Sequence, residues 1–142
     1  MKKKYKILII TEIDHIYNVK NRLQKIGSIK YLDDPNPKDV LKIVADYDVI
    51  FTNPNKSKVK IDKKILKKAK KLKIICTAST GTNHIDTKAA KNLKIKIFSL
   101  KNEKKLINKI SSTAELAFSM LLMSNRNMFN AINSVRKGQW DY

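Results

Sequence analysis

The sequence predicts an α/β fold of the flavodoxin-like (Rossmann-like) type, with a five-stranded parallel sheet, helices on both faces and a long C-terminal helix. Two observations predict the sheet. Short apolar runs bounded by polar residues alternate along the chain with segments whose apolar residues recur at helical spacing. The apolar runs are nearly continuous, which is typical of parallel strands that helices cover on both sides. Strand–helix–strand units of this kind close by right-handed crossovers.

The first element along the chain is a strand expected at Lys6–Thr11, an Ile-rich run that is too short for a helix. Apolar residues at helical spacing then predict a helix over Tyr17–Ile26, which Gly27 ends. The alternating segment Ser28–Leu32 predicts the second strand.

A turn rich in Asp, Asn and Pro leads to a second helix, whose apolar stripe runs from Val40 to Ala45. The apolar run Asp48–Thr52 predicts the third strand. A loop is expected directly after it, because Pro54 cannot donate to the sheet ladder.

The third helix is marked by apolar residues from Ile61 to Ala69, and the fourth strand is expected at Lys73–Thr77. Asp86 can cap a short helix at Thr87–Asn92. The fifth strand is expected at Lys94–Phe98.

Beyond the sheet, Ser112 and Glu115 form a capping box that predicts the start of a long helix. This helix is apolar nearly all round, so we expect it to pack against a second domain or a second subunit. A shorter helix over Asn130–Trp140 follows. We therefore divide the chain into a sheet domain at 1–104 and interdomain or dimerisation helices at 105–142.

The composition limits the class of protein. The chain has 142 residues, the size of one domain, and a formal net charge of +19 from Lys residues spread along the sequence. This spread indicates a solvated surface, so we expect no specific nucleic-acid partner. The single Cys76 excludes an intrachain disulfide, and no apolar run is long enough to span a membrane, so a cytoplasmic protein is expected. No metal-ligand spacing is present, and no metal site is predicted.

The loop that follows the fourth strand is the richest candidate site. Ligands of open parallel sheets bind outside the carboxyl ends of the strands. Small residues from Ala78 to Thr82 would let backbone N–H groups hold an anion, and a carboxylate would suit this loop. The alternative is a tight turn that needs only the permissive backbone of Gly81.

Four motifs in fixed order carry a family resemblance. They are Gly81-Thr82-Asn83-His84-Ile85-Asp86, Ser112-Thr113-Ala114-Glu115, Arg126-Asn127 and Gly138 with Trp140. In this arrangement the chain resembles the D-isomer-specific 2-hydroxyacid dehydrogenases, including the phosphoglycerate dehydrogenase-like members. The resemblance covers residues 75–140 specifically and the whole chain loosely.

The resemblance implies an NAD-dependent oxidoreductase that transfers a hydride between NAD(H) and a small 2-hydroxy or 2-oxo acid. Thr80, Gly81 and Thr82 would hold the substrate carboxylate on their backbone amides, with Asn53 as a weaker candidate that more simply forms a turn before proline. His84 is interpreted as a local hydrogen-bonding residue.

No catalytic and no cofactor-binding residue is assigned to this chain. The catalytic Arg, Glu and His of the family lie in and beyond its NAD-binding domain, and the G-x-G-x-x-G turn of that domain is not among these residues. We therefore expect the chain alone to be inactive and not to bind NAD. The resemblance also implies a homodimer through the helix from Ser112 to Arg126, with Arg126 and Trp140 as packing anchors.

Two other interpretations stay open. Glu12 and Asp14 after the first strand and Lys101 after the fifth suit the phospho-acceptor site of a receiver-like signalling domain. However, Asn53 stands where the acceptor Asp is needed, and an amide cannot form an acyl phosphate. A stand-alone binding or dimerisation module would keep the apolar helix as its oligomer contact.

Overall fold

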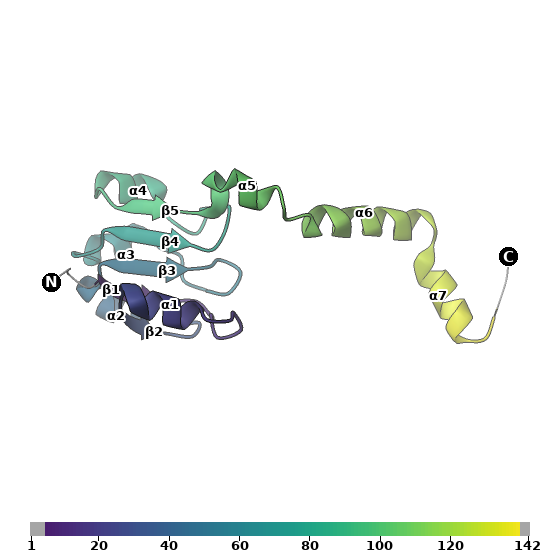
Figure 1. Ribbon diagram of the computed structural model, residues 1–142, viewed down its shortest axis with the longest axis horizontal. Helices are drawn as coiled ribbons and strands as arrows, with labels where there is room; N and C mark the ends of the chain where they lie inside the picture. The colour runs from purple at the N-terminus through teal and green to yellow at the C-terminus, as the bar shows by residue number, and fades with distance from the viewer. Residues whose placement is uncertain (1–4, 140–142) are drawn as a thin grey trace. The chain divides into compact units, whose positions relative to one another are not determined.

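A five-stranded parallel sheet forms the first of two compact units, which extends to Asn102, whereas the second begins at Glu103. The computed structural model describes residues 5–139. The strand order is β2-β1-β3-β4-β5, and every neighbouring pair is parallel (Figure 1). The predicted α/β class and the five-stranded parallel sheet are confirmed.

The bounds of the elements follow the predicted alternation. The strands are β1 (Tyr5–Ile9), β2 (Gly27–Tyr31), β3 (Val49–Thr52), β4 (Ile74–Thr77) and β5 (Lys96–Phe98). The helices of the first unit are α1 (Val19–Ile26), α2 (Pro37–Ile43), α3 (Lys63–Lys68) and α4 (Thr87–Asn92), with short 3-10 turns η1 (Val44–Asp46) and η2 (Leu100–Asn102).

Two apolar cores lie on the two faces of the sheet, because successive strand residues point to opposite sides. Ile7 and Ile9 of β1 pack on the side of α1, where Val19 and Leu23 contact them. Leu8 joins the larger core on the other side, beneath α2, α3 and α4. Figure 1 shows α1 in front of the sheet and α3 and α4 behind it. Helices therefore cover both faces, as the sequence predicted.

An isolated parallel bridge joins Ile61 and Ile85 outside the sheet. Ile61 donates its N–H to the carbonyl of His84 at 2.8 Å and accepts from the N–H of Asp86 at 2.9 Å. The prediction that Ile61 belongs to the third helix is wrong for this reason, since α3 begins after Asp62, whose Oδ1 caps the N–H of Ile65 at 2.9 Å. The bridge anchors the segment before α4.

The end of α4 also differs from the prediction. Lys94, expected in the fifth strand, adopts a left-handed conformation with φ 57°. Ile95 donates to the carbonyl of Ala90 at 2.9 Å and Lys94 to that of Lys91 at 3.0 Å, which is the Schellman pattern of a helix C-terminus. Lys94 therefore belongs to the C-terminal end of α4, and β5 starts at Lys96.

The second unit contains α5 (Lys104–Ile107), α6 (Ser112–Asn125) and α7 (Met128–Arg136). The predicted capping box is wrong by one residue: the N-cap of α6 is Ser111, and Ser111 Oγ donates to Glu115 Oε1 at 2.5 Å. α7 begins two residues before the predicted Asn130. The predicted end of that helix at Trp140, and the packing role of Trp140, lie outside the described residues.

Candidate functional site

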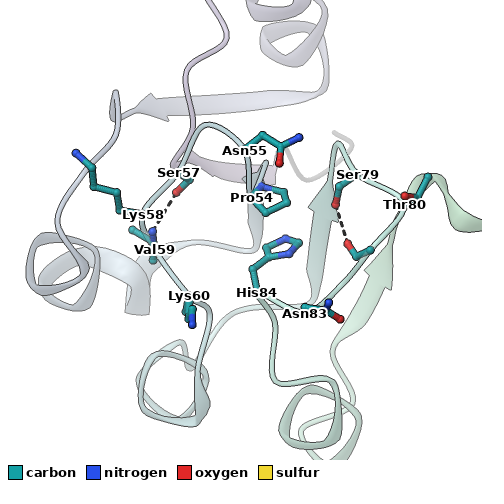
Figure 2. Close-up of a pocket in the computed structure, with 11 residues that line it drawn as sticks. Pro54, Asn55, Ser57, Lys58, Val59, Lys60, Ser79, Thr80, Asn83 and His84 are labelled. Carbon is teal, nitrogen blue, oxygen red and sulfur yellow. Dashed lines mark hydrogen bonds between the residues drawn. The ribbon is translucent and has the colours of Figure 1, made fainter. Parts of the chain in front are cut away.

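Two loops at the carboxyl edge of the sheet form the walls of a pocket. Thr52 and Thr77 are paired in register as the last residues of β3 and β4, so the segments that follow them leave the sheet side by side. The pocket has a volume of about 620 Å³. It is lined by Pro54, Asn55, Ser57, Lys58, Val59 and Lys60 on one wall and by Ser79, Thr80, Gly81, Asn83 and His84 on the other (Figure 2).

Three of the four carbonyl groups from Ser79 to Thr82 accept hydrogen bonds, whereas the N–H groups of this stretch are available. The carbonyl of Ser79 accepts from Leu100 N–H at 2.9 Å, that of Gly81 from Ser79 Oγ at 2.7 Å, and that of Thr82 from Ile85 N–H at 2.9 Å. Within residues 5–139, none of the N–H groups from Ser79 through Thr82 donates a hydrogen bond. Consecutive free N–H groups of this kind attract an anion.

No contact or backbone angle among the described residues requires a glycine at position 81. Its φ is not positive, and a Cβ built on it would have no heavy atom within 4 Å. The permissive backbone of glycine is therefore not what the turn uses at this position. The missing side chain instead leaves the backbone open to close approach by another molecule.

His84 is buried behind the loop, with its side chain between the two walls in Figure 2. Its Nε2 lies 2.9 Å from Thr77 Oγ1, which lies 2.8 Å from Ser79 Oγ. Burial lowers the pKa of His84 below its ordinary value, so the ring is neutral at pH 7. The prediction that His84 makes local hydrogen bonds is confirmed.

The charged side chains on the pocket are lysines. Lys58 and Lys60 are the only charged residues among the described residues that line it. Lys58 Nζ lies 2.6 Å from Asp34 Oδ2, and this hydrogen bond holds the pKa of Asp34 below its usual range and raises that of Lys58. Asp34 therefore offsets the positive charge of Lys58, whereas Lys60 has no ion-pair partner among the described residues.

Thr80 and Gly81 line the pocket, whereas Asn53 and Thr82 do not. Asn53 instead forms a turn. Its Oδ1 accepts from the N–H of Asn55 at 3.1 Å, which is the turn expected before Pro54. Contact between Asn53 and a substrate stays a prediction. Beside it, Thr52 is buried, and its Oγ1 has no hydrogen-bond partner among the described residues.

Sequence reasoning missed the bond between Thr77 and His84 and the positions of Lys58 and Lys60. The available signal for the bond was Thr77, a polar residue that ends a buried strand seven positions before His84. The two lysines carried no signal, because Lys is frequent along the whole chain.

Metal-ligand clusters and membrane-spanning helices are both absent from the described part of the chain. Between residues 5 and 139, no group of three or more His, Cys, Asp or Glu side chains could hold a metal ion. No helix within the same range has the length and apolar character needed to cross a bilayer.

Comparison with known proteins decides the family. The model of the D-isomer specific 2-hydroxyacid dehydrogenase catalytic domain matches residues 7–138. The chain belongs to this family. The glyoxylate reductase of Thermococcus litoralis is 32% identical over 121 residues, which cover 83% of this chain. The D-3-phosphoglycerate dehydrogenase of Methanocaldococcus jannaschii is 28% identical over 119 residues, or 84% of this chain.

A solved dehydrogenase has the same fold. The NAD-dependent formate dehydrogenase of Staphylococcus aureus, solved in complex with NAD, matches 96% of the chain with a TM-score of 0.72 and 25% identity. The chain matches 43% of that structure, and 34% and 21% of the glyoxylate reductase and the phosphoglycerate dehydrogenase. It therefore spans less than half the length of these dehydrogenases. Family membership leaves the receiver-like interpretation without support.

Proposed function

We propose that this chain is the substrate-binding part of an NAD-dependent D-2-hydroxyacid dehydrogenase. The amides of Thr80, Gly81 and Thr82 hold the carboxylate of a small 2-hydroxy or 2-oxo acid. The observation that carries the proposal is the run of N–H groups from Ser79 to Thr82, which have no acceptor among the described residues, at a glycine whose Cβ would meet no other atom there. In the complete enzyme, bound NAD supplies or accepts the hydride at C2 of the acid.

The chemistry of this loop is binding and orientation. A carboxylate accepts charge-assisted hydrogen bonds from backbone N–H groups, and the positive charge of Lys60 adds to its attraction. Holding the carboxylate fixes the direction of the neighbouring C2 atom, which lowers the entropic cost of reaction. The carbonyls of Ser79, Gly81 and Thr82 already accept hydrogen bonds, so they cannot turn toward the anion and repel it.

The residues of this chain do not fit NAD. Its glycines stand at positions 27, 81 and 138, so no G-x-G-x-x-G turn can form among them. We propose that other residues of the complete enzyme bind NAD and carry the catalytic Arg, Glu and His. A fluorescence titration of the 142-residue chain with NADH is expected to show no binding, and saturable binding would contradict this assignment.

A titration with D-glycerate, followed by backbone amide NMR, tests the carboxylate site. We expect saturable shifts at Thr80, Gly81 and Thr82, and none with glycerol, which lacks the carboxylate. Gly81→Ala is expected to weaken binding about tenfold, because its methyl group occupies the open approach. Stability should be unchanged, since that methyl group meets no other atom.

Lys88→Ala, on the exposed side of α4, is the control variant and should bind glycerate like the wild type. Equal shifts with glycerol, or glycerate shifts confined to other loops, would remove the proposal.

We also propose that the helix from Ser112 to Arg126 mediates homodimerisation. Leu116, Phe118 and Leu121 of α6 are each more than three-fifths exposed, which is unusual for large apolar side chains on one helix. Sedimentation velocity over a range of concentrations should show a dimer. Leu121→Glu should shift the monomer–dimer equilibrium to monomer. Ser119→Glu places the same charge at a polar position and tests whether charge alone is responsible. A monomer at all concentrations would overturn this proposal.

A further inference from the structure

A chain of side-chain hydrogen bonds runs from the interior of the sheet unit to the backbone of the binding loop. It links His84 Nε2 to Thr77 Oγ1 at 2.9 Å, Thr77 Oγ1 to Ser79 Oγ at 2.8 Å, and Ser79 Oγ to the carbonyl of Gly81 at 2.7 Å. The buried end is the imidazole ring, and the exposed end is the peptide that joins Gly81 to Thr82.

The direction of every bond in this chain follows from the proton count. A carbonyl oxygen only accepts, so the single hydroxyl proton of Ser79 is used on Gly81. Ser79 Oγ must then accept from Thr77, whose own single proton is used there. Thr77 Oγ1 is left as an acceptor toward the ring, and His84 must carry a proton on Nε2.

The environment of the ring keeps it neutral. Burial disfavours the charged imidazolium, so one ring nitrogen carries the only proton. The backbone of His84 is held as well, because its carbonyl accepts from Ile61 N–H at 2.8 Å in the bridge before α3. The ring is thus neutral, and the backbone that carries it is held in place.

We propose that His84 is a positioning residue that sets, through Thr77 and Ser79, the orientation of the peptide between Gly81 and Thr82. In a trans peptide the C=O and N–H groups point in opposite directions. A carbonyl of Gly81 drawn toward Ser79 therefore turns Thr82 N–H outward, as a donor to a ligand. The consequence for carboxylate binding rests on the function proposed above, whereas the directed hydrogen bonds do not.

The protonated nitrogen of His84 can be observed without any ligand. Long-range ¹H–¹⁵N correlation of the imidazole at pH 7 should show Nε2 protonated and Nδ1 bare. A neutral ring with its proton on Nδ1 would overturn the proposal, because Thr77 would then donate to the ring and could not donate to Ser79.

Substitutions of Thr77 test the transmission to the loop. Thr77→Val removes the relay at nearly constant volume, and Thr77→Ser keeps the hydroxyl. We expect the valine variant to shift the Thr82 amide resonance and to weaken D-glycerate binding about tenfold, since one directed hydrogen bond is lost. The serine variant should restore both, to within about twofold of the wild-type affinity.

Ser79→Ala, in the partly exposed loop, provides a second test if the valine variant does not fold. It breaks the last bond and should reproduce the Thr82 shift and the weaker binding. Variants that lose only thermal stability, with Thr82 and glycerate affinity unchanged, would show a structural role and overturn the proposal. If wild-type Thr82 does not respond to glycerate, the proposed function fails, while the protonated nitrogen still decides the inference.

Discussion

At Gly27 the chain passes directly from α1 into β2, beside Tyr5 of β1. The backbone is extended there, so any residue could adopt it, but a Cβ would lie 2.1 Å from the carbonyl oxygen of Tyr5. That oxygen belongs to the backbone of a paired strand and cannot move without disturbing the register. Gly27 is therefore required by close packing, in contrast to Gly81.

We expect Gly27→Ala to lower the free energy of unfolding by about 1–3 kcal/mol, because the strands must separate to admit the methyl group. Urea denaturation measures the difference. Gly81→Ala is the matched control and should stay within about 0.5 kcal/mol of the wild type. Equal losses in the two variants would contradict the distinction between these glycines.

The buried ring of His84 makes stability depend on pH. Its pKa in the folded protein is lowered by burial, whereas in the unfolded chain it is near the ordinary value of about 6.5. Below that value the unfolded state binds more protons, so stability falls as the pH falls. Above about pH 6.5, protonation of His84 no longer reduces the free energy of unfolding.

We expect the free energy of unfolding to decrease between about pH 7 and pH 5 more steeply in the wild type than in His84→Gln, which cannot titrate. Urea denaturation at several pH values measures both slopes. Parallel slopes would mean that His84 keeps its ordinary pKa in the folded protein.

At the scale of elements, Lys94 occupies the C-terminal position of α4 at which glycine is usual. A left-handed conformation costs a residue with a Cβ about 1 kcal/mol. We expect Lys94→Gly to raise the free energy of unfolding by up to about that amount. Lys91→Gly, the same substitution within α4, should instead lower it by about 1 kcal/mol. Thermal denaturation of both variants checks the opposite signs, and a loss in both would refute the strain at Lys94.

The elements themselves were largely predictable from the sequence, because apolar periodicity reports burial, and burial decides which segments form the sheet and its helices. The ends of the elements were less predictable. By sequence pattern, Lys94 is typical of a strand and Ile61 of a helix. The backbone of Lys94 instead forms a helix terminus, and that of Ile61 forms a bridge with Ile85. The spacing of Ser112 to Glu115 favoured Ser112 as the cap, and only the backbone shows that the cap is Ser111.

The sequence predicted which loop forms the candidate site, but not the opposite wall of its pocket or the direction of its hydrogen bonds. Small residues after a buried strand predicted the loop from Ala78 to Thr82, and the family resemblance implied Thr80, Gly81 and Thr82 as backbone donors. The pocket opposite them depends on Lys58 and Lys60, whose wall is brought alongside by strand pairing between β3 and β4. Hydrogen-bond direction depends on which protons are already used, and no residue pattern contains that information.

For the molecule as a whole, charge repulsion should outweigh the surface ion pairs. The formal net charge is +19, and the ion pairs among residues 5–139, such as Lys42 with Asp39 and Lys71 with Asp46, are mostly well exposed. Exposed pairs contribute about 0–1 kcal/mol each, and salt screens them together with the repulsion.

We therefore expect the melting temperature to rise when NaCl is added to a low-salt buffer, because screening relieves the repulsion between lysines. Differential scanning calorimetry over a salt series measures the change. A falling melting temperature would show that the ion pairs dominate. Sucrose at equal osmolality controls for effects that do not depend on charge.

The strand order also determines how the sheet can assemble during translation. β2 pairs with β1, β3 then joins the free edge of β1, and β4 and β5 each join the strand made just before. No strand has to insert between two earlier ones, so every new strand leaving the ribosome meets an edge that already exists. Each addition also covers an edge that could otherwise pair with another nascent chain.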